Sequence, residues 1–149
     1  MANAHKVHLR IVTAEAQVYN SEADLIIAPG GAGELGIQAR HIPIVTTLKP
    51  GALRIIQNND ENIYALAGGF LEVRDDGEGS AAIVLAGSAE SAENIDLERA
   101  EAARARAAQR LSESQTEVDA ARAQAALLRA AARIRVAELY RSRRSAVRG

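Results

Sequence analysis

Arginine is the residue type whose spacing most directly suggests chemistry in this sequence. Two segments each carry three arginines with the same spacing of seven and then four residues: Arg99, Arg106 and Arg110, and Arg122, Arg129 and Arg133. On a helix, this spacing places each triplet on one side. Guanidinium groups make bidentate contacts with phosphate, so converging triplets could bind an anion such as a triphosphate. The alternative is a set of solvated arginines that pair with Glu98, Glu101 and Glu117.

Other reactive residue types give no case for a catalytic or metal site. His5, His8 and His41 lack metal-ligand spacing apart from a His5/His8 pair, and there is no Ser/His/Asp or paired-carboxylate arrangement. The segment Gly31–Gly36 matches the dinucleotide pattern GxGxxG, but Pro43 follows too soon for the helix that this pattern needs. We therefore expect a glycine-rich hairpin between strands, no catalytic residues and no metal.

A change in composition along the chain predicts which structural elements position the arginines. All three prolines and ten of the eleven glycines lie in the first 87 residues, whereas residues 91–148 contain neither type. Glycine and proline mark turns, and alanine, which dominates the second part, favours helix. The 149 residues therefore predict two architectures in one chain.

Charge divides at the same place. Residues 1–90 have six Lys/Arg and eleven Asp/Glu, a net charge of −5, whereas residues 91–149 have twelve Arg and eight Asp/Glu, a net charge of +4. This asymmetry favours an acidic partner for the second part. There is no cysteine, so a disulfide framework is excluded. We expect no signal peptide and no membrane span, because no apolar run is long enough.

The first part has the pattern of a β domain. Val7, Leu9 and Ile11 alternate with other residues, as in a half-buried strand. Short β-rich runs separated by turn residues follow at residues 16–19, 24–28, 33–38, 44–48, 52–57, 62–67, 70–74 and 81–86. Many short strands at this spacing predict a sandwich or barrel.

The second part has the pattern of a helical hairpin. Asp96 can cap a first helix to about Leu111, and Ser114 with Glu117 forms a capping box for a second helix. The first helix carries an apolar stripe of Leu97, Ala100, Ala103, Ala107 and Leu111. The second carries one of Val118, Ala121, Ala125, Leu128, Ala132, Val136 and Leu139. Because an alanine seam buries little apolar area, the hairpin could be always docked or able to open. We expect its hinge at residues 88–94.

The basic C-terminal tail favours a protein partner. The only acidic residue near these arginines in the sequence is Glu138. The arginines are Arg141, Arg143, Arg144 and Arg148. No aromatic residues that could stack on bases are interleaved with them, so nucleic acid is not expected. An acidic protein surface is the expected partner of this tail.

Several blocks of the sequence resemble the epsilon subunit family of F-type ATP synthases over nearly the full length. The blocks are residues 11–15, 29–37, 41–43, 48–51 and 68–73, and the motif IDxxRA at residues 95–100. The resemblance implies an α+β fold: an N-terminal β-sandwich of about ten strands at residues 1–88, followed by an antiparallel helix pair at residues 89–149. It also implies a non-catalytic subunit of the central rotor stalk that joins the gamma subunit to the c-ring.

The resemblance also implies roles for particular residues. Glu34 would face the c-ring, and His41 would lie near gamma. ATP would be a regulatory ligand rather than a required cofactor. Its site would include Ile95, Asp96, Arg99, Ala100, Arg122, Arg129 and Arg133. In an extended hairpin, the beta subunit of the alpha/beta head would meet Arg133, Arg135, Arg141, Arg143 and Arg144, and ATP hydrolysis would be inhibited.

An alternative from another class is a free-standing ATP-sensing module that uses the same arginine cluster. The resemblance instead implies a peripheral membrane complex on the cytoplasmic face of a bacterial plasma membrane, with the chain attached to the membrane only through that complex.

Overall fold

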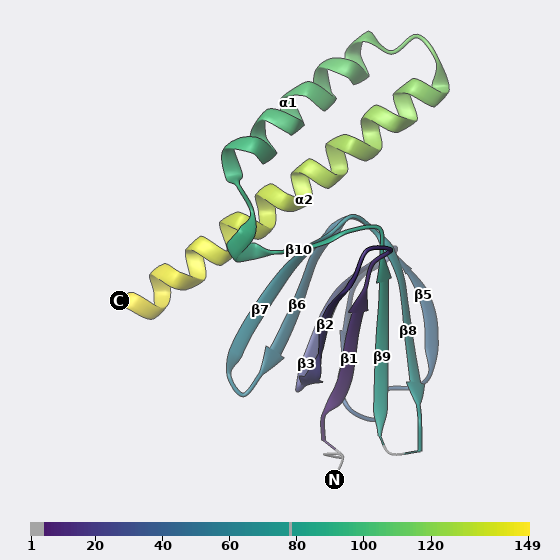
Figure 1. Ribbon diagram of the computed structural model, residues 1–149, viewed down its shortest axis with the longest axis vertical. Coiled ribbons are helices and arrows are strands. Elements are labelled where there is room, and N and C mark those ends of the chain that lie inside the picture. The colour runs from purple at the N-terminus through teal and green to yellow at the C-terminus, as the bar shows by residue number, and fades with distance from the viewer. Residues whose placement is uncertain (1–4, 78) are drawn as a thin grey trace.

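The structure is a computed structural model that describes residues 5–77 and 79–149. It consists of a β-sandwich and a helical hairpin that projects from it (Figure 1). The described strands are β1 (Val7–Val12), β2 (Gln17–Ala23), β3 (Leu25–Gly30), β4 (Gly33–Ile37), β5 (Ile44–Leu48), β6 (Gly51–Gln57), β7 (Asp60–Leu66), β8 (Gly69–Asp75), β9 (Ser80–Ala86) and β10 (Ala89–Ser91). The predicted α+β sandwich followed by a helix pair is confirmed.

The strands form one hydrogen-bonded path that folds into two layers. The order is β10-β7-β6-β3-β5-β8-β9-β1-β2, with β4 paired to β3. The layers meet where β3 joins β5 through the single pair of Gly30 and Leu48. All ladders are antiparallel except that of β1 with β9. The predicted hairpin at the GxGxxG segment is confirmed, because β3 and β4 flank Gly31 and Ala32.

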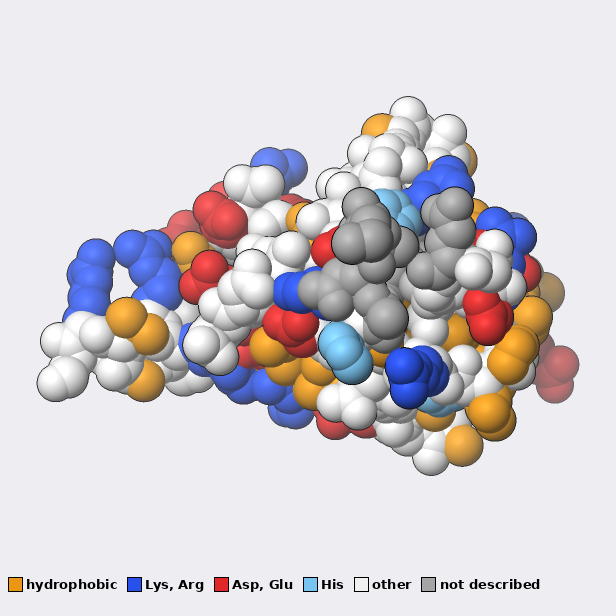
Figure 2. Space-filling model, turned by 90° about the horizontal axis from the view of Figure 1, so that it is seen from below, with side chains coloured by type: hydrophobic (Ala, Val, Ile, Leu, Met, Phe, Trp, Pro, Cys, Tyr) orange, Lys and Arg blue, Asp and Glu red, His pale blue; other side chains and the backbone are white. Residues whose placement is uncertain are grey.

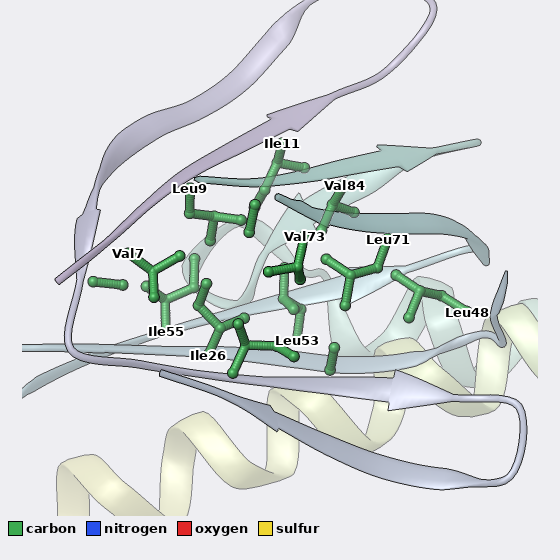
Figure 3. Close-up of a cluster of buried hydrophobic side chains, with 14 of the residues drawn as sticks. Val7, Leu9, Ile11, Ile26, Leu48, Leu53, Ile55, Leu71, Val73 and Val84 are labelled. Carbon is green, nitrogen blue, oxygen red and sulfur yellow. The ribbon is translucent and has the colours of Figure 1, made fainter. Parts of the chain in front are cut away.

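The sandwich core consists of the inward-facing residues of both layers (Figure 3). Val7, Leu9 and Ile11 of β1 are fully buried, as their alternation predicts. From the facing layer, Leu53 and Ile55 of β6 are also fully buried. Aliphatic side chains dominate this core, which gives the sandwich its own hydrophobic stabilisation.

Gly68 and Gly69 allow the start of β8 to approach the end of β9 closely. Gly68 has φ +102° and Gly69 has φ +153°, backbone angles that side chains rarely adopt. A Cβ atom on Gly69 would lie 1.9 Å from the carbonyl oxygen of Leu85. Only glycine therefore fits at the start of β8.

The segment expected to act as a hinge is anchored to the sandwich. Its first part forms the tenth strand, β10, which pairs with β7. A 3₁₀ turn, η1 (Ala92–Asn94), follows, and Ala92 is buried in a cluster with Ile63 and Val136. Movement of the hairpin must therefore begin after η1 or break this packing.

The two helices are α1 (Leu97–Glu113) and α2 (Glu117–Arg148). The predicted cap of α1 is confirmed, because Asp96 Oδ1 accepts a hydrogen bond of 3.1 Å from the Arg99 amide. The predicted capping box of α2 is wrong. Thr116 caps α2 by accepting a hydrogen bond from the Asp119 amide, whereas the Ser114 hydroxyl donates to the Arg110 carbonyl and so completes α1.

The apolar stripe predicted for α1 is confirmed, and that for α2 holds only in its C-terminal half. In α2, Ala132 and Val136 are buried, and Val136 packs on Ile63 and Ala65 of β7, but Val118 and Leu128 are 60% and 47% exposed. The sandwich does not extend beneath the hairpin turn (Figure 1). A second face of α2 packs on α1 and carries Ala123 and Ala130, seven residues apart.

Candidate functional site

Five of the residues implied in ATP binding line one recess where α1 begins. The recess has a volume of about 300 Å³, and the five residues are Ile95, Asp96, Arg99, Ala100 and Arg133. Arg106 and Glu90 also line it, together with Asn94 and Ala103. The IDxxRA segment joins the end of η1 to the first turn of α1, whereas Arg133 is on α2. The antiparallel packing of the helices therefore brings together residues that are more than thirty positions apart.

An ion pair occupies part of this recess. Arg133 Nε lies 3.0 Å from Glu90 Oε2, with both side chains partly exposed. Glu90 was not among the predicted site residues, because it lies on β10, the strand that the sequence pattern did not indicate. Arg99 and Arg106 make no ion pair within the described part of the chain, so the recess keeps two guanidinium groups available for an anion.

Arg129 and Arg122 lie progressively farther towards the hairpin turn. Arg129 lines a recess of about 190 Å³ with Arg106, Arg110 and Arg133. Arg122 lies in a larger, open recess with Arg110 and Arg129. Arg133 lies eleven positions after Arg122 on the same helix, which corresponds to about 16 Å along the axis. The structure thus does not bring Arg122 together with Asp96 and Arg99.

The arginines implied in contact with the beta subunit have different surroundings in this docked hairpin. Arg143 forms an ion pair with Glu61 of β7, and Arg54 Nε of β6 lies 2.5 Å from the same carboxylate. Arg144 lies over the ring of Tyr140, 5.6 Å from its centroid. The other members of this set are the exposed Arg135 and Arg141, and Arg133, which is paired with Glu90.

The two residues implied in stalk contacts lie on different parts of the sandwich, Glu34 on a strand and His41 on a loop. Glu34 is exposed on β4, opposite Pro29. His41 is half-buried, and its Nδ1 donates a hydrogen bond of 2.7 Å to the Ile42 carbonyl. The preceding residue, Arg40, has φ +65°, and its amide donates to the Ser80 hydroxyl at 2.6 Å. This bond fixes the loop that carries His41 to the start of β9.

An exposed apolar face lies beside the His41 loop, on the outer side of β5, β8 and β9. Val45, Phe70 and Leu85 are 75%, 55% and 51% exposed. Phe70 is directly opposite Leu85 across β8 and β9. Ile42, also exposed, extends the surface into the loop. Figure 2 shows hydrophobic side chains gathered on the side of the sandwich away from the C-terminal end of α2. We call Val45, Phe70, Leu85 and Ile42 the apolar face.

The remaining ionisable groups do not form a reaction centre. Burial raises the pKa of Tyr19 and, together with the nearby Tyr19 and Glu93, that of Tyr64. The two rings pack edge to face with centroids 6.1 Å apart, as part of the core. Within residues 5–77 and 79–149, no three His, Cys, Asp or Glu residues are arranged to hold a metal ion, and no helix is long and apolar enough to cross a membrane.

Known proteins resemble the chain along most of its length. The family model of the ATP synthase delta/epsilon chain β-sandwich domain matches residues 6–92, and that of the long α-helix domain matches residues 93–138. The ATP synthase epsilon chain of Desulforamulus reducens is 49% identical over 104 residues, which cover 70% of this chain and 76% of the relative. That of Bacillus subtilis is 43% identical over 106 residues, 71% of this chain and 77% of the relative.

A solved structure shows the same fold. A chain in the mitochondrial ATP synthase of Euglena gracilis, seen with its OSCP, F1 and c-ring, superposes with a TM-score of 0.73 at 24% identity. The match covers 86% of this chain and 78% of that chain.

The sandwich, the helix pair and these matches define a non-catalytic subunit of a rotary ATPase. The chain belongs to the ATP synthase delta/epsilon family, and its relatives are epsilon chains. It is thus a rotor subunit of the central stalk of an F-type ATP synthase, a membrane-associated complex, and takes part in ATP synthesis and proton transport without a catalytic site of its own. The resemblance inferred from the sequence is confirmed.

Proposed function

We propose that the sandwich couples the gamma subunit to the c-ring, with the apolar face as its gamma-binding surface and the β3–β4 hairpin that carries Glu34 at the c-ring. In a bacterial cell, the complex would lie on the cytoplasmic face of the plasma membrane. The observation that carries this proposal is the apolar face itself, because three large side chains on adjacent strands are more than half exposed. Contiguous exposed apolar surface of this kind is typical of protein interfaces.

The position of the apolar face supports the same proposal. It adjoins the His41 loop, whose geometry is fixed by the bond to Ser80. It also lies on the layer opposite the one that α2 covers. A partner can therefore occupy the apolar face while the hairpin stays docked.

The test is co-purification of the full chain with gamma. Phe70→Ser and Val45→Asp should fold normally, because both side chains are exposed, and should lose most of their gamma binding. Val147→Asp is the matched control, since Val147 is exposed on the distant end of α2. Undiminished gamma binding by both apolar-face variants would refute the assignment of this surface.

We further propose that the recess of Asp96, Arg99 and Arg133 binds ATP as a regulatory ligand that favours the docked hairpin. The supporting observation is that the IDxxRA segment and Arg133 line one recess, in which Arg99 and Arg106 form no ion pair with any described residue. A phosphate group could accept hydrogen bonds from these arginines. Because ATP would bridge α1 and α2, it would favour the docked state over one in which the recess is lost.

When ATP is scarce, the hairpin would extend and its arginines would meet acidic surface on the beta subunit, which would inhibit hydrolysis. Arg133 and Arg143 must first leave Glu90 and Glu61, so docking and contact with the head exclude each other. The hairpin arginines would thus have two alternative sets of acidic partners: Glu90 and Glu61 in the docked state, and the beta subunit in the extended state.

Calorimetry with ATP and the full chain tests the nucleotide site. Arg99→Gln should abolish the heat of binding, and Arg104→Gln, an exposed arginine of α1 outside every described recess, should retain it. Absence of binding heat at millimolar ATP in the wild-type chain would reject the site.

A further inference from the structure

The largest described recess on the hairpin is at its turn, away from the Asp96 recess. It has a volume of about 800 Å³ and is open to solvent. Arg110 reaches it from the end of α1, and Arg122 and Arg129 reach it from the start of α2. We call these three residues the tip arginines. They lie on both sides of the groove between the helices.

The tip arginines share their recess with two carboxylates but are not paired with them. In the part of the chain that the structure describes, none of the three forms an ion pair. Glu113 and Asp119 also line the recess, but neither lies within ion-pair distance of an arginine. Glu113 instead accepts a hydrogen bond from the Gln109 amide group. Three guanidinium groups, one from α1 and two from α2, thus line the same recess.

The same half of the hairpin is the least supported part of the fold. The sandwich does not reach it, as the exposure of Val118 and Leu128 shows. The buried contacts between α1 and α2 there involve Ala107 and Ala123, small side chains that bury little apolar area. The tip arginines are all exposed and carry like charge, so they add no attraction between the helices.

We propose that the recess at the hairpin turn is a second anion site, which binds a chain of linked phosphate groups and so clamps α1 to α2. Arg122 and Arg129 are seven residues apart, about 10 Å along the helix axis. A di- or triphosphate that extends along the groove can therefore contact both guanidinium groups without requiring the two side chains to converge on one phosphate. Each phosphate group can accept paired hydrogen bonds from a guanidinium group.

The ligand can be an inorganic condensed phosphate or the phosphate tail of a nucleotide. The proposal does not depend on ATP binding in the Asp96 recess, because Arg110 and Arg122 do not line that recess. It does assign a role to Arg122, which the structure separates from the other residues implied in ATP binding.

Amide hydrogen exchange of the full chain, measured with pyrophosphate, tripolyphosphate or ATP at matched ionic strength without magnesium, tests the site. A ligand that binds only the closed tip slows exchange through tip opening by the factor 1 + [L]/Kd. At a ligand concentration of ten times Kd, amides in residues 108–127 should exchange about tenfold more slowly. Tripolyphosphate alone should produce this protection, which identifies the phosphate chain as the recognised group.

Charge-matched variants separate the two recesses. Arg122→Gln and Arg110→Gln should each lose the tip protection, and Arg99→Gln and Arg104→Gln should keep it. Glutamine retains good helix propensity, and circular dichroism of each variant verifies the helices. The proposal is overturned if tripolyphosphate leaves the tip amides unprotected, if only ATP protects them, or if Arg99→Gln abolishes the protection as fully as Arg122→Gln.

Discussion

Glu61 is expected to hold the hairpin on the sandwich. Its carboxylate, 11% exposed, pairs with Arg54 of the neighbouring strand and with Arg143 of α2. Among the described residues, this is the ion pair that joins the far end of α2 to the sandwich. Loss of the contact between Glu61 and Arg143 should therefore favour undocking of α2.

The magnitude follows from the exposure of the two side chains. An exposed ion pair contributes about 0–1 kcal/mol, and breaking a fully buried one costs about 3–5 kcal/mol. Arg143 is 46% exposed while Glu61 is nearly covered, so we expect about 1–2 kcal/mol for this pair. That energy changes the ratio of docked to undocked hairpin by a factor of about 5 to 30.

A double-mutant cycle isolates this pair from the contact with Arg54. Hydrogen exchange of the amides of residues 132–148 reports undocking in Glu61→Gln, Arg143→Gln and the double variant, with Arg148→Gln as the control. The coupling energy should be about 1 kcal/mol or more. A coupling below about 0.3 kcal/mol, the range of simple additivity, would refute the role of Glu61.

Two further predictions concern the sandwich. Gly69→Ala should lower the free energy of unfolding by about 2–4 kcal/mol in urea denaturation, because its Cβ would collide with Leu85. Gly87→Ala is the control and should have little effect, because its Cβ would have no contact closer than 3.9 Å. Equal stabilities of the two variants would contradict the steric argument. The hydrogen bond from the Asn58 amide lowers the pKa of Asp24 from its ordinary 3.8, so Asp24 contributes stability above that pH and loses it as the pH falls through the lower folded-state value. The difference in urea midpoint between wild type and Asp24→Asn should therefore shrink in acid, and a difference independent of pH would contradict this linkage.

The sandwich could be predicted from the sequence because its signals are local. The alternation of Val7, Leu9 and Ile11, and the glycine and proline turns, indicated nine of the strands. Only β10 was missed. It has three residues, Ala89–Ser91, without β-branched or aromatic side chains, and it forms because β7 offers a free edge. Such tertiary pairing has no local pattern.

The α2 stripe shows where periodicity stops being informative. Val118 and Leu128 share the helical face of Val136, but only Val136 has a sheet beneath it. The face that packs on α1 is made of alanines such as Ala123 and Ala130, which differ little from exposed alanines in the sequence. Periodicity also could not predict that Arg122 lies far from Asp96, because that separation depends on the register of the two helices.

The arrangement of the two layers would allow the proposed coupling and the proposed regulation to operate independently. The apolar face is on the outer side of β5, β8 and β9, and α2 covers the outer side of β6 and β7. Undocking α2 would expose Ile63 and Ala65 but leave the other layer and its core unchanged. Gamma binding should therefore be the same with the hairpin docked or released.

If Glu61 controls that release, Glu61→Gln should lower ATP hydrolysis by the assembled enzyme without weakening gamma binding. Arg143→Gln should inhibit less than Glu61→Gln, because it removes both the docking contact and an arginine proposed to meet the head.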